Sequence, residues 1–144
     1  MASIHKEVII DAPAGHIWDA IRDVGAIHTR LARGFVTDTR LEGDARDVTF
    51  TNGAVVRERI VDLDDRARRI AYAAVGGRFT HHSASIQVFP DGDSRSRVVW
   101  IADLLPHELA DLVGEMMEQG CAAMKRTLEQ SNPILDRHAA RAEA

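Results

Sequence analysis

Six strand-like segments follow one another along the chain without a helix between them, and this order limits the possible folds more than any other feature of the sequence. From residue 35 onward the apolar side chains recur with a period of two, which is typical of half-buried strands. The segments are residues 35–41, 48–51, 55–63, 70–75, 82–89 and 98–104. Short turn-forming stretches such as Asn52-Gly53 join them, and turns this short connect antiparallel neighbours. The pattern therefore predicts an antiparallel meander.

Helix-like patterns lie on both sides of these segments. Residues 4–10 are rich in β-branched side chains and predict one more strand, after which Asp11 and Pro13 provide the cap-type residue and first-turn proline of a helix. The apolar stripe of this helix consists of Ile17, Trp18, Ile21 and Val24. A second short helix or turn is expected at residues 25–31.

The last element is a long amphipathic helix that begins at Pro106, runs to about Asn132 and is closed by Pro133. Its apolar side chains share one face, and they are Leu109, Val113, Met116, Gly120, Met124 and Leu128. Such a helix is roughly 39 Å long, and seven strands side by side span roughly 30 Å. The predicted architecture is therefore α+β: a curved seven-stranded antiparallel sheet wraps around the C-terminal helix, and two short helices after the first strand close one end.

Length and composition predict one globular domain. The chain has 144 residues, and we expect residues 1–135 to form a single domain with a flexible tail at residues 136–144. The net charge of -4 argues against a nucleic-acid partner, and no segment has the apolar length of a membrane span or the pattern of a signal peptide. Cys121 is the single cysteine, so no disulfide framework is expected. These features predict a cytoplasmic protein and leave open whether it forms a homodimer.

Aromatic residues make up only 5% of the chain, so aliphatic and small side chains must fill most of the interior. The alternation along each strand sorts its residues onto two faces. It turns Glu58, His82 and Trp100 toward the apolar side of the sheet, together with the small residues Ala84 and Ala102. Small inward side chains between a curved sheet and a helix favour spare volume over close packing. We therefore expect an internal cavity.

Glu58 is the candidate site residue with the clearest chemistry. A carboxylate among apolar side chains needs a partner or a proton, and burial raises its pKa. The expected partner is His82 or an ordered water. Two interpretations stay open: this contact stabilises the cavity wall, or it fixes the orientation of a bound ligand. Glu58 and His82 are also candidates for general acid and base, because a buried combination of this kind can bring a pKa near neutrality.

The other candidate ligand-binding residues also allow a purely structural interpretation, as core, cap or surface side chains. They are His28, Phe50, Tyr72, Ile86, Trp100, Met116, Gly120 and Met124. His28 lies in the short helix that we expect to close the cavity, and Cys121 is expected to be buried and inert. The sequence contains no HExxH, GxGxxG, P-loop or GxSxG motif, so neither a metal nor a cofactor is predicted.

Several stretches of the chain together resemble one known superfamily. They include ERIVDLDDRARRIAY at residues 58–72, Gly76-Gly77, HSASI at residues 82–86, PDGD at residues 90–93 and VVW at residues 98–100. With Ile17-Trp18 and residues 120–125 in the helices, they resemble the START-like, Bet v 1-like (SRPBCC) superfamily. The likeness is greatest to the bacterial polyketide cyclase/dehydrase type 2 family, and more distant to plant abscisic acid receptors. It covers nearly the whole chain and implies the helix-grip fold, in agreement with the predicted order of elements.

The resemblance also implies pocket residues. The pocket glutamate of the receptors corresponds to Glu58, and an aromatic position corresponds to His82. The turn at residues 51–55 corresponds to the receptors' gating loop, but it reads Asn-Gly-Ala-Val where the receptors have Ser-Gly-Leu-Pro. The latch histidine-arginine pair is also absent around residues 78–79. Hormone-dependent binding of a phosphatase is therefore not implied.

Three functions agree with the sequence. The first is binding of a small hydrophobic or amphipathic molecule (a lipid, an aromatic or a polyketide-like compound) in a cavity between the sheet and the C-terminal helix. The alternative is a cofactor-independent cyclase or dehydratase in which Glu58 or His82 acts as general acid or base. The third is an accessory domain that works through protein contacts.

Overall fold

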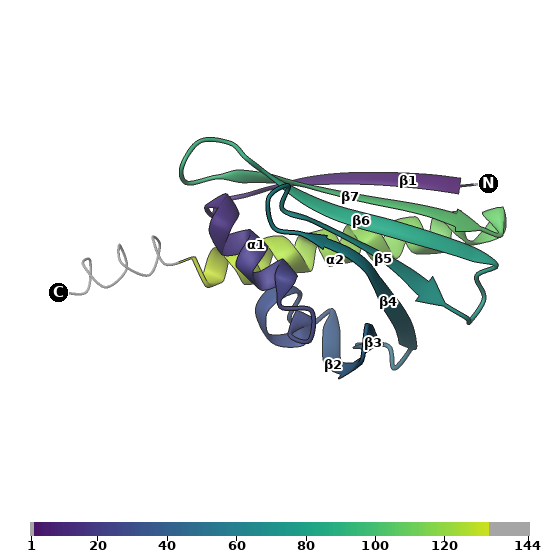
Figure 1. The fold of residues 1–144 in the computed structure, drawn as a ribbon. Helices are drawn as coiled ribbons and strands as arrows, with labels where there is room; N and C mark the ends of the chain where they lie inside the picture. Colours follow the sequence, from purple (N-terminus) through teal and green to yellow (C-terminus); the bar gives the residue numbers. More distant parts are fainter. Residues whose placement is uncertain (1, 133–144) are drawn as a thin grey trace.

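Seven strands form one antiparallel sheet that curves around the long helix α2 in the computed structural model, which describes residues 2–132 (Figure 1). The strands are β1 (Ala2–Ile10), β2 (Val36–Glu42), β3 (Ala45–Phe50), β4 (Val55–Asp64), β5 (Arg69–Val75), β6 (His81–Pro90) and β7 (Ser96–Leu105). The helical elements are α1 (Ala14–Arg22), η1 (Ile27–Leu31), η2 (His107–Leu109) and α2 (Ala110–Gln130). The predicted α+β architecture is confirmed. The proposed tail at residues 136–144 and the closing Pro133 lie outside the described residues.

The order of strands across the sheet is β1-β7-β6-β5-β4-β3-β2, so the predicted meander is present and β1 returns to pair with β7. Between Ile60 and Asp62 the pairing of β4 with β5 shifts by one residue, which leaves Val61 out of the ladder and 65% exposed. Because of this bulge, both Ile60 and Leu63 pack against the core. Bulges bend a strand and increase its twist, so this one contributes to the curvature that encloses α2.

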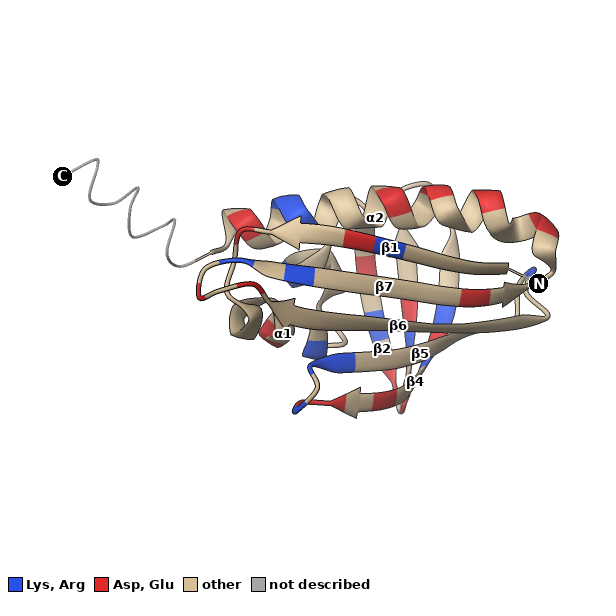
Figure 2. Cartoon of the chain, turned by 90° about the horizontal axis from the view of Figure 1, so that it is seen from above, with Lys and Arg blue, Asp and Glu red and all other residues tan. Residues whose placement is uncertain are grey.

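Helix α2 runs beside β1 and below the concave face of the sheet (Figures 1 and 2). Its buried face includes Gly120, Met124 and Leu128 of the predicted stripe, while Val113 and Met116 are half-buried. The helix is shorter at its start than predicted, because His107–Leu109 form a separate 3₁₀ turn after Pro106. Within the part of the chain that is described, no helix is long and apolar enough to cross a membrane.

Helix α1 and the single turn η1 cover one end of the sheet (Figure 1). Ile17, Trp18 and Ile21 of the predicted stripe are buried. The prediction that Asp11 caps α1 is wrong, because Pro13 occupies the cap position and no side chain caps the helix. The backbone N–H of Asp11 instead donates to a carboxylate oxygen of Glu129, 2.8 Å away, and so connects the start of α1 to the end of α2.

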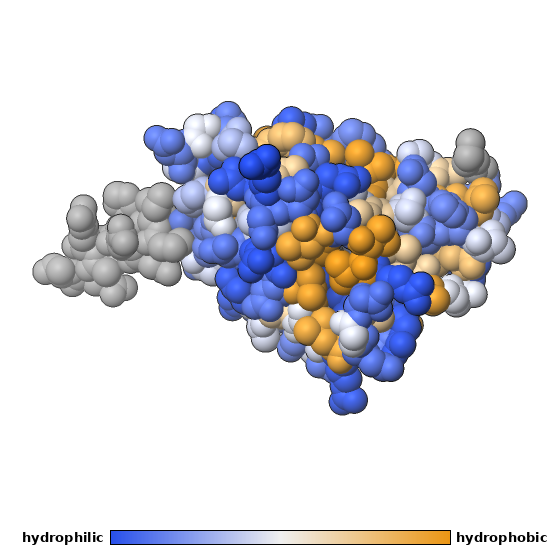
Figure 3. Space-filling model, viewed as in Figure 1, coloured by the Kyte–Doolittle hydropathy of each residue, from blue (hydrophilic) through white to orange (hydrophobic). Residues whose placement is uncertain are grey.

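The surface of the molecule is largely hydrophilic on the face shown in Figure 3, with apolar side chains gathered near its centre. Figure 1 places β4 in this part of the view. The exposed large apolar side chains of β4 are Val55 and Val61, at 61% and 65% exposure.

Candidate functional site

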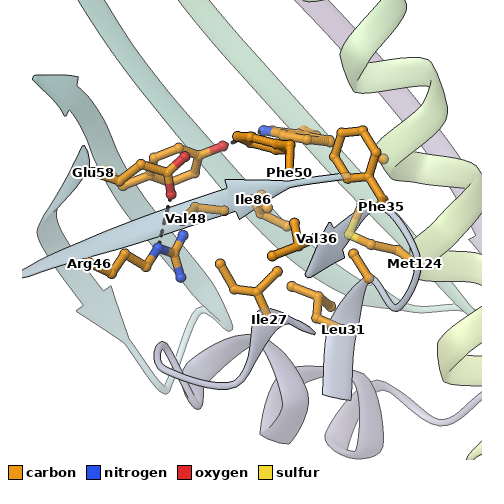
Figure 4. Close-up of a pocket in the computed structure, with 14 residues that line it drawn as sticks. Ile27, Leu31, Phe35, Val36, Arg46, Val48, Phe50, Glu58, Ile86 and Met124 are labelled. Carbon is orange, nitrogen blue, oxygen red and sulfur yellow. Dashed lines mark hydrogen bonds and ion pairs between the residues drawn. The ribbon is translucent and has the colours of Figure 1, made fainter. Parts of the chain in front are cut away.

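Two adjoining cavities lie between the concave face of the sheet and α2. We call the first the η1 cavity, because Ile27 and Leu31 of η1 close it; its volume is about 60 Å³ (Figure 4). We call the second the His82 cavity, after the histidine in its wall, and its volume is about 110 Å³. Both cavities are lined by Phe35, Phe50, Glu58, Tyr72 and Trp100. The spare volume expected from the small inward side chains is therefore present, and Ala102 lines the His82 cavity.

Glu58 points into both cavities, and its partner is Arg46. The Arg46 Nε donates to Glu58 Oε1 at 2.9 Å, and the side chains are only 5% and 12% exposed, respectively (Figure 4). Arg46 also donates to the carbonyl oxygen of Val24 at 3.2 Å. Burial raises the pKa of the Glu58 carboxyl, and the charge and hydrogen bond of Arg46 oppose that rise. The prediction that His82 or a water partners Glu58 is therefore corrected.

Arg46 is the main site residue that our sequence analysis missed. The predicted strand began at residue 48, whereas β3 begins at Ala45 and includes Arg46. Val48 and Phe50 face the cavities, so the alternation of β3 places Arg46 on the same face. Extending the strand backward by this period would have found it.

Tyr72 and Trp100 are joined by a hydrogen bond in the wall that the two cavities share. The indole Nε1 of Trp100 donates to the Tyr72 hydroxyl oxygen at 2.8 Å. Burial raises the pKa of Tyr72, so its phenol is neutral at physiological pH. The sequence left the orientation of Tyr72 open, and the structure places its ring inward, 5% exposed.

His82 is held by the backbone of the neighbouring strand. The backbone pairing of β5 with β6 runs only as far as Tyr72 and Ala84, so the N–H of Ala74 is free to donate to His82 Nδ1, at 2.9 Å. Burial lowers the pKa of His82. Because Nδ1 accepts a hydrogen bond, the proton of the neutral ring is on Nε2. The rings of Phe79 and Tyr72 lie 4.9 and 6.1 Å from the imidazole, centroid to centroid.

Most of the remaining predicted residues also line the cavities. Phe50, Ile86, Gly120 and Met124 line the η1 cavity, and Met116 lines the His82 cavity. Gly120 brings α2 close to the sheet, since a Cβ at this position would lie 2.8 Å from the Trp100 ring. His28 lies in η1 as expected but lines neither cavity: its Nδ1 is 3.1 Å from the Thr39 hydroxyl.

An aromatic pair lines both cavities and a neighbouring hollow. The rings of Phe35 and Phe50 meet edge to face, with centroids 5.2 Å apart. Outside them lies a hollow of about 290 Å³ that these two rings share with Thr51, Asn52, Met116 and Gln119. The Thr51 hydroxyl donates to the Gly34 carbonyl and holds this turn against the segment before Phe35. Phe35 was not among the predicted site residues.

Cys121 is buried in α2, and burial raises the pKa of its thiol to about 11. A thiol of this kind is a poor nucleophile at neutral pH. Among residues 2–132, no three His, Cys, Asp or Glu side chains are grouped as a metal site requires.

Comparison with known protein families places the chain in one of them. The family model described as polyketide cyclase/dehydrase and lipid transport matches residues 1–139. The chain belongs to this family. The resemblance to START-like proteins is thereby confirmed, although no curated protein matches the chain.

Three of the similar solved structures match over almost their whole length. A protein from Thermobifida fusca is 27% identical with a TM-score of 0.72, and the match covers 90% of this chain and 91% of that one. The Zhui aromatase/cyclase from Streptomyces sp. R1128 is 18% identical with a TM-score of 0.71, over 90% and 92% of the two chains. A START superfamily protein from Mycobacterium smegmatis is 17% identical with a TM-score of 0.72, over 89% and 97%. These likenesses show the helix-grip fold.

Proposed function

We propose that this protein binds a small hydrophobic or amphipathic molecule in the η1 and His82 cavities. The observation that carries the proposal is the arrangement of polar groups in the shared wall. Glu58 and Tyr72 are buried among mostly apolar side chains, and each is oriented by a partner, Arg46 or Trp100. Apolar walls with a few fixed polar groups are typical of ligand sites.

The volumes set the size of the ligand. A dry apolar cavity of about 150 Å³ can hold benzene, whereas pockets for drug-sized ligands measure about 300–1,000 Å³. The η1 and His82 cavities, at about 60 and 110 Å³, therefore suit a compact molecule. A longer lipid or polyketide-like chain would have to displace Phe35 and Phe50 and extend into the hollow outside them.

Filling the cavity tests the proposal. Native mass spectrometry of the purified protein, with thermal-shift screening of small lipophilic compounds, should detect a bound or stabilising molecule. Ala102→Leu should abolish this binding, because Ala102 lines the His82 cavity. Ala73→Leu is the matched control, since Ala73 lies on the opposite face of β5 from Tyr72 and outside both cavities. Failure of every compound to bind, or equal binding by Ala102→Leu, would reject the proposal.

A second candidate function is a cyclase or dehydratase that acts on an aromatic or polyketide-like substrate, as the family description suggests. Burial raises the pKa of Glu58, which favours it as a general acid or base. His82 fits the role of base less well, because Nδ1 is occupied by the Ala74 N–H. If the protein converts the compound found by screening, Glu58→Gln should stop the conversion while binding persists. Unchanged conversion would remove Glu58 from the mechanism.

A further inference from the structure

The polar groups in the wall of the His82 cavity restrict the chemistry of a ligand. This restriction rests on the proposed binding function. Four residues of this wall have polar side-chain groups: Glu58, Tyr72, His82 and Trp100, whose indole N–H already donates to Tyr72. Glu58 is neutralised by Arg46, and Arg46 is the single cationic residue in the described lining of the two cavities. The space between sheet and helix therefore has no unpaired charge to offer an ion.

The bonding of His82 gives this space a hydrogen-bond donor of known direction. The Ala74 N–H occupies Nδ1, so the neutral ring has its hydrogen on Nε2. Within residues 2–132, no hydrogen-bond partner of Nε2 is found. Every buried side-chain nitrogen and oxygen in this part of the chain has a partner, so Nε2 is not one of the buried atoms. Nε2 is therefore at least partly exposed to solvent, and His82 lines the cavity. Neighbouring Phe79 and Tyr72 fix the plane of the ring by packing beside it.

We propose that the site selects an uncharged molecule about the size of one ring that contains a hydrogen-bond acceptor, such as a ketone or ether oxygen, and that His82 Nε2 donates to this acceptor. The two adjoining cavities, at about 60 and 110 Å³, set the size, since a cavity of about 150 Å³ holds benzene. The Nε2–H of His82 requires a hydrogen-bond acceptor in the ligand, because such an acceptor pairs with a donor that has no partner in the described part of the chain. A carboxylate is excluded, since it would lose its hydration without gaining a free counter-ion.

Three probes of nearly equal shape test this proposal. Acetophenone contains a carbonyl, α-methylstyrene replaces the carbonyl oxygen with a methylene group, and benzoate replaces the acetyl group with a carboxylate. One net hydrogen bond corresponds to about a fivefold difference in Kd. We expect acetophenone to bind about fivefold more tightly than α-methylstyrene, and benzoate to bind about a hundredfold more weakly than acetophenone.

The role of His82 is measured directly by NMR on protein labelled with ¹⁵N-histidine. Acetophenone should shift the Nε2 resonance of His82, and α-methylstyrene should shift it far less. His82→Phe should lose the preference for acetophenone, because the carbonyl is then buried without a donor, whereas the control His81→Gln, on the exposed face of the same strand, should keep it. If His82→Phe does not fold, the wild-type spectra still show whether acetophenone binds at Nε2 of His82.

The outcomes separate the two proposals. Equal binding of acetophenone and α-methylstyrene, or a Nε2 resonance that acetophenone leaves unchanged, would overturn the role of His82 while ligand binding in the cavity stands. Tighter binding of benzoate would overturn the exclusion of anions. If none of the three probes binds, the ligand class is wrong, and the wider screen with Ala102→Leu decides on the binding function separately.

Discussion

Arg46 and Glu58 lie directly opposite each other on β3 and β4, and the guanidinium Nε donates to the carboxylate Oε1 at 2.9 Å. One residue further along, Asp47 and Arg57 form the same kind of pair on the other face of the same two strands, also at 2.9 Å. The first pair is buried, and the second is 32% and 42% exposed. The same two strands therefore contain one buried and one exposed arginine–carboxylate pair, and the exposed arginine also donates to Glu42.

Removing one member of the buried pair should destabilise the protein strongly. Arg46→Met leaves the Glu58 carboxylate buried without its partner, which typically costs about 3–5 kcal/mol of the free energy of unfolding. Replacing both residues, in Arg46→Met/Glu58→Leu, should recover much of this loss, because no buried charge then remains. Denaturant unfolding followed by circular dichroism measures both effects.

The exposed pair provides the control for this experiment. Arg57 also pairs with Glu42 at 2.8 Å, but Arg57→Met should still change stability far less, since solvent screens both carboxylates. The single variant Glu58→Leu completes the comparison. If the double variant loses as much stability as Arg46→Met and Glu58→Leu added together, the two side chains do not act as a pair.

The contrast between the two pairs also shows what a sequence reveals. The order of strands and helices could be predicted because a period of two, then turn residues, then a long helical period are local signals. The inward placement of Glu58 followed from the same alternation. The identity of its partner, Arg46, could not be predicted in this way. The polar residues Arg46 and Asp47 interrupt the apolar pattern at the start of β3, so the predicted strand began too late.

His82 illustrates a second limit of sequence reasoning. Its inward orientation could be predicted from the alternation of β6. Its hydrogen bond with the Ala74 N–H depends on where β5 and β6 stop pairing, which is after Tyr72 and Ala84. No local pattern in the sequence marks that point.

Acidification should weaken the fold through His82. Burial, and to a smaller extent the charge of His81, lower the pKa of His82 below its usual value near 6.5. Above that pH the ring is neutral in both the folded and the unfolded chain. As pH falls from about 6.5 through the lower pKa of the folded state, the unfolded chain binds the proton first, so stability decreases.

A comparison of variants isolates this contribution. The slope for one proton is at most about 1.4 kcal/mol per pH unit. Between about pH 7 and about pH 5, the free energy of unfolding of the wild type should fall more than that of His82→Phe. Denaturant titration at each pH measures this difference. His5→Gln, at an exposed position on β1, should behave as wild type. Identical pH profiles for wild type and His82→Phe would contradict the lowered pKa.

Tyr72→Phe should destabilise the protein by about 1–3 kcal/mol, because the indole N–H of Trp100 loses its acceptor inside the protein. The same substitution in a Trp100→Phe background should cost less, since no donor then remains unsatisfied. Thermal unfolding of the four proteins measures the coupling between the two residues. Equal costs in both backgrounds would show that this hydrogen bond does not stabilise the fold.

Gly120→Ala tests how tightly α2 packs against the sheet, and two opposing effects decide the result. Alanine favours a helix over glycine by about 1 kcal/mol. The new Cβ would, however, lie 2.8 Å from one ring carbon of Trp100 and 3.2 Å from the Phe35 ring, and overpacking of this kind costs about 1–3 kcal/mol. The Trp100 ring cannot move freely, since Tyr72 accepts its N–H, so we expect overpacking to equal or exceed the gain.

Gly114→Ala is the matched control in the same helix, because the nearest atom to its added Cβ is Ile4 Cδ1 at 3.9 Å, an ordinary contact. It should stabilise the protein by up to about 1 kcal/mol, so the two variants should differ by about 1–3 kcal/mol in the free energy of unfolding. Gly120→Ala should also change the fluorescence of Trp100, measured with Trp18→Phe as the background, because the ring must shift away from the new Cβ. Equal stabilisation by both alanines would mean that the ring yields without cost, and that the wall of the cavity is softer than its hydrogen bond to Tyr72 implies.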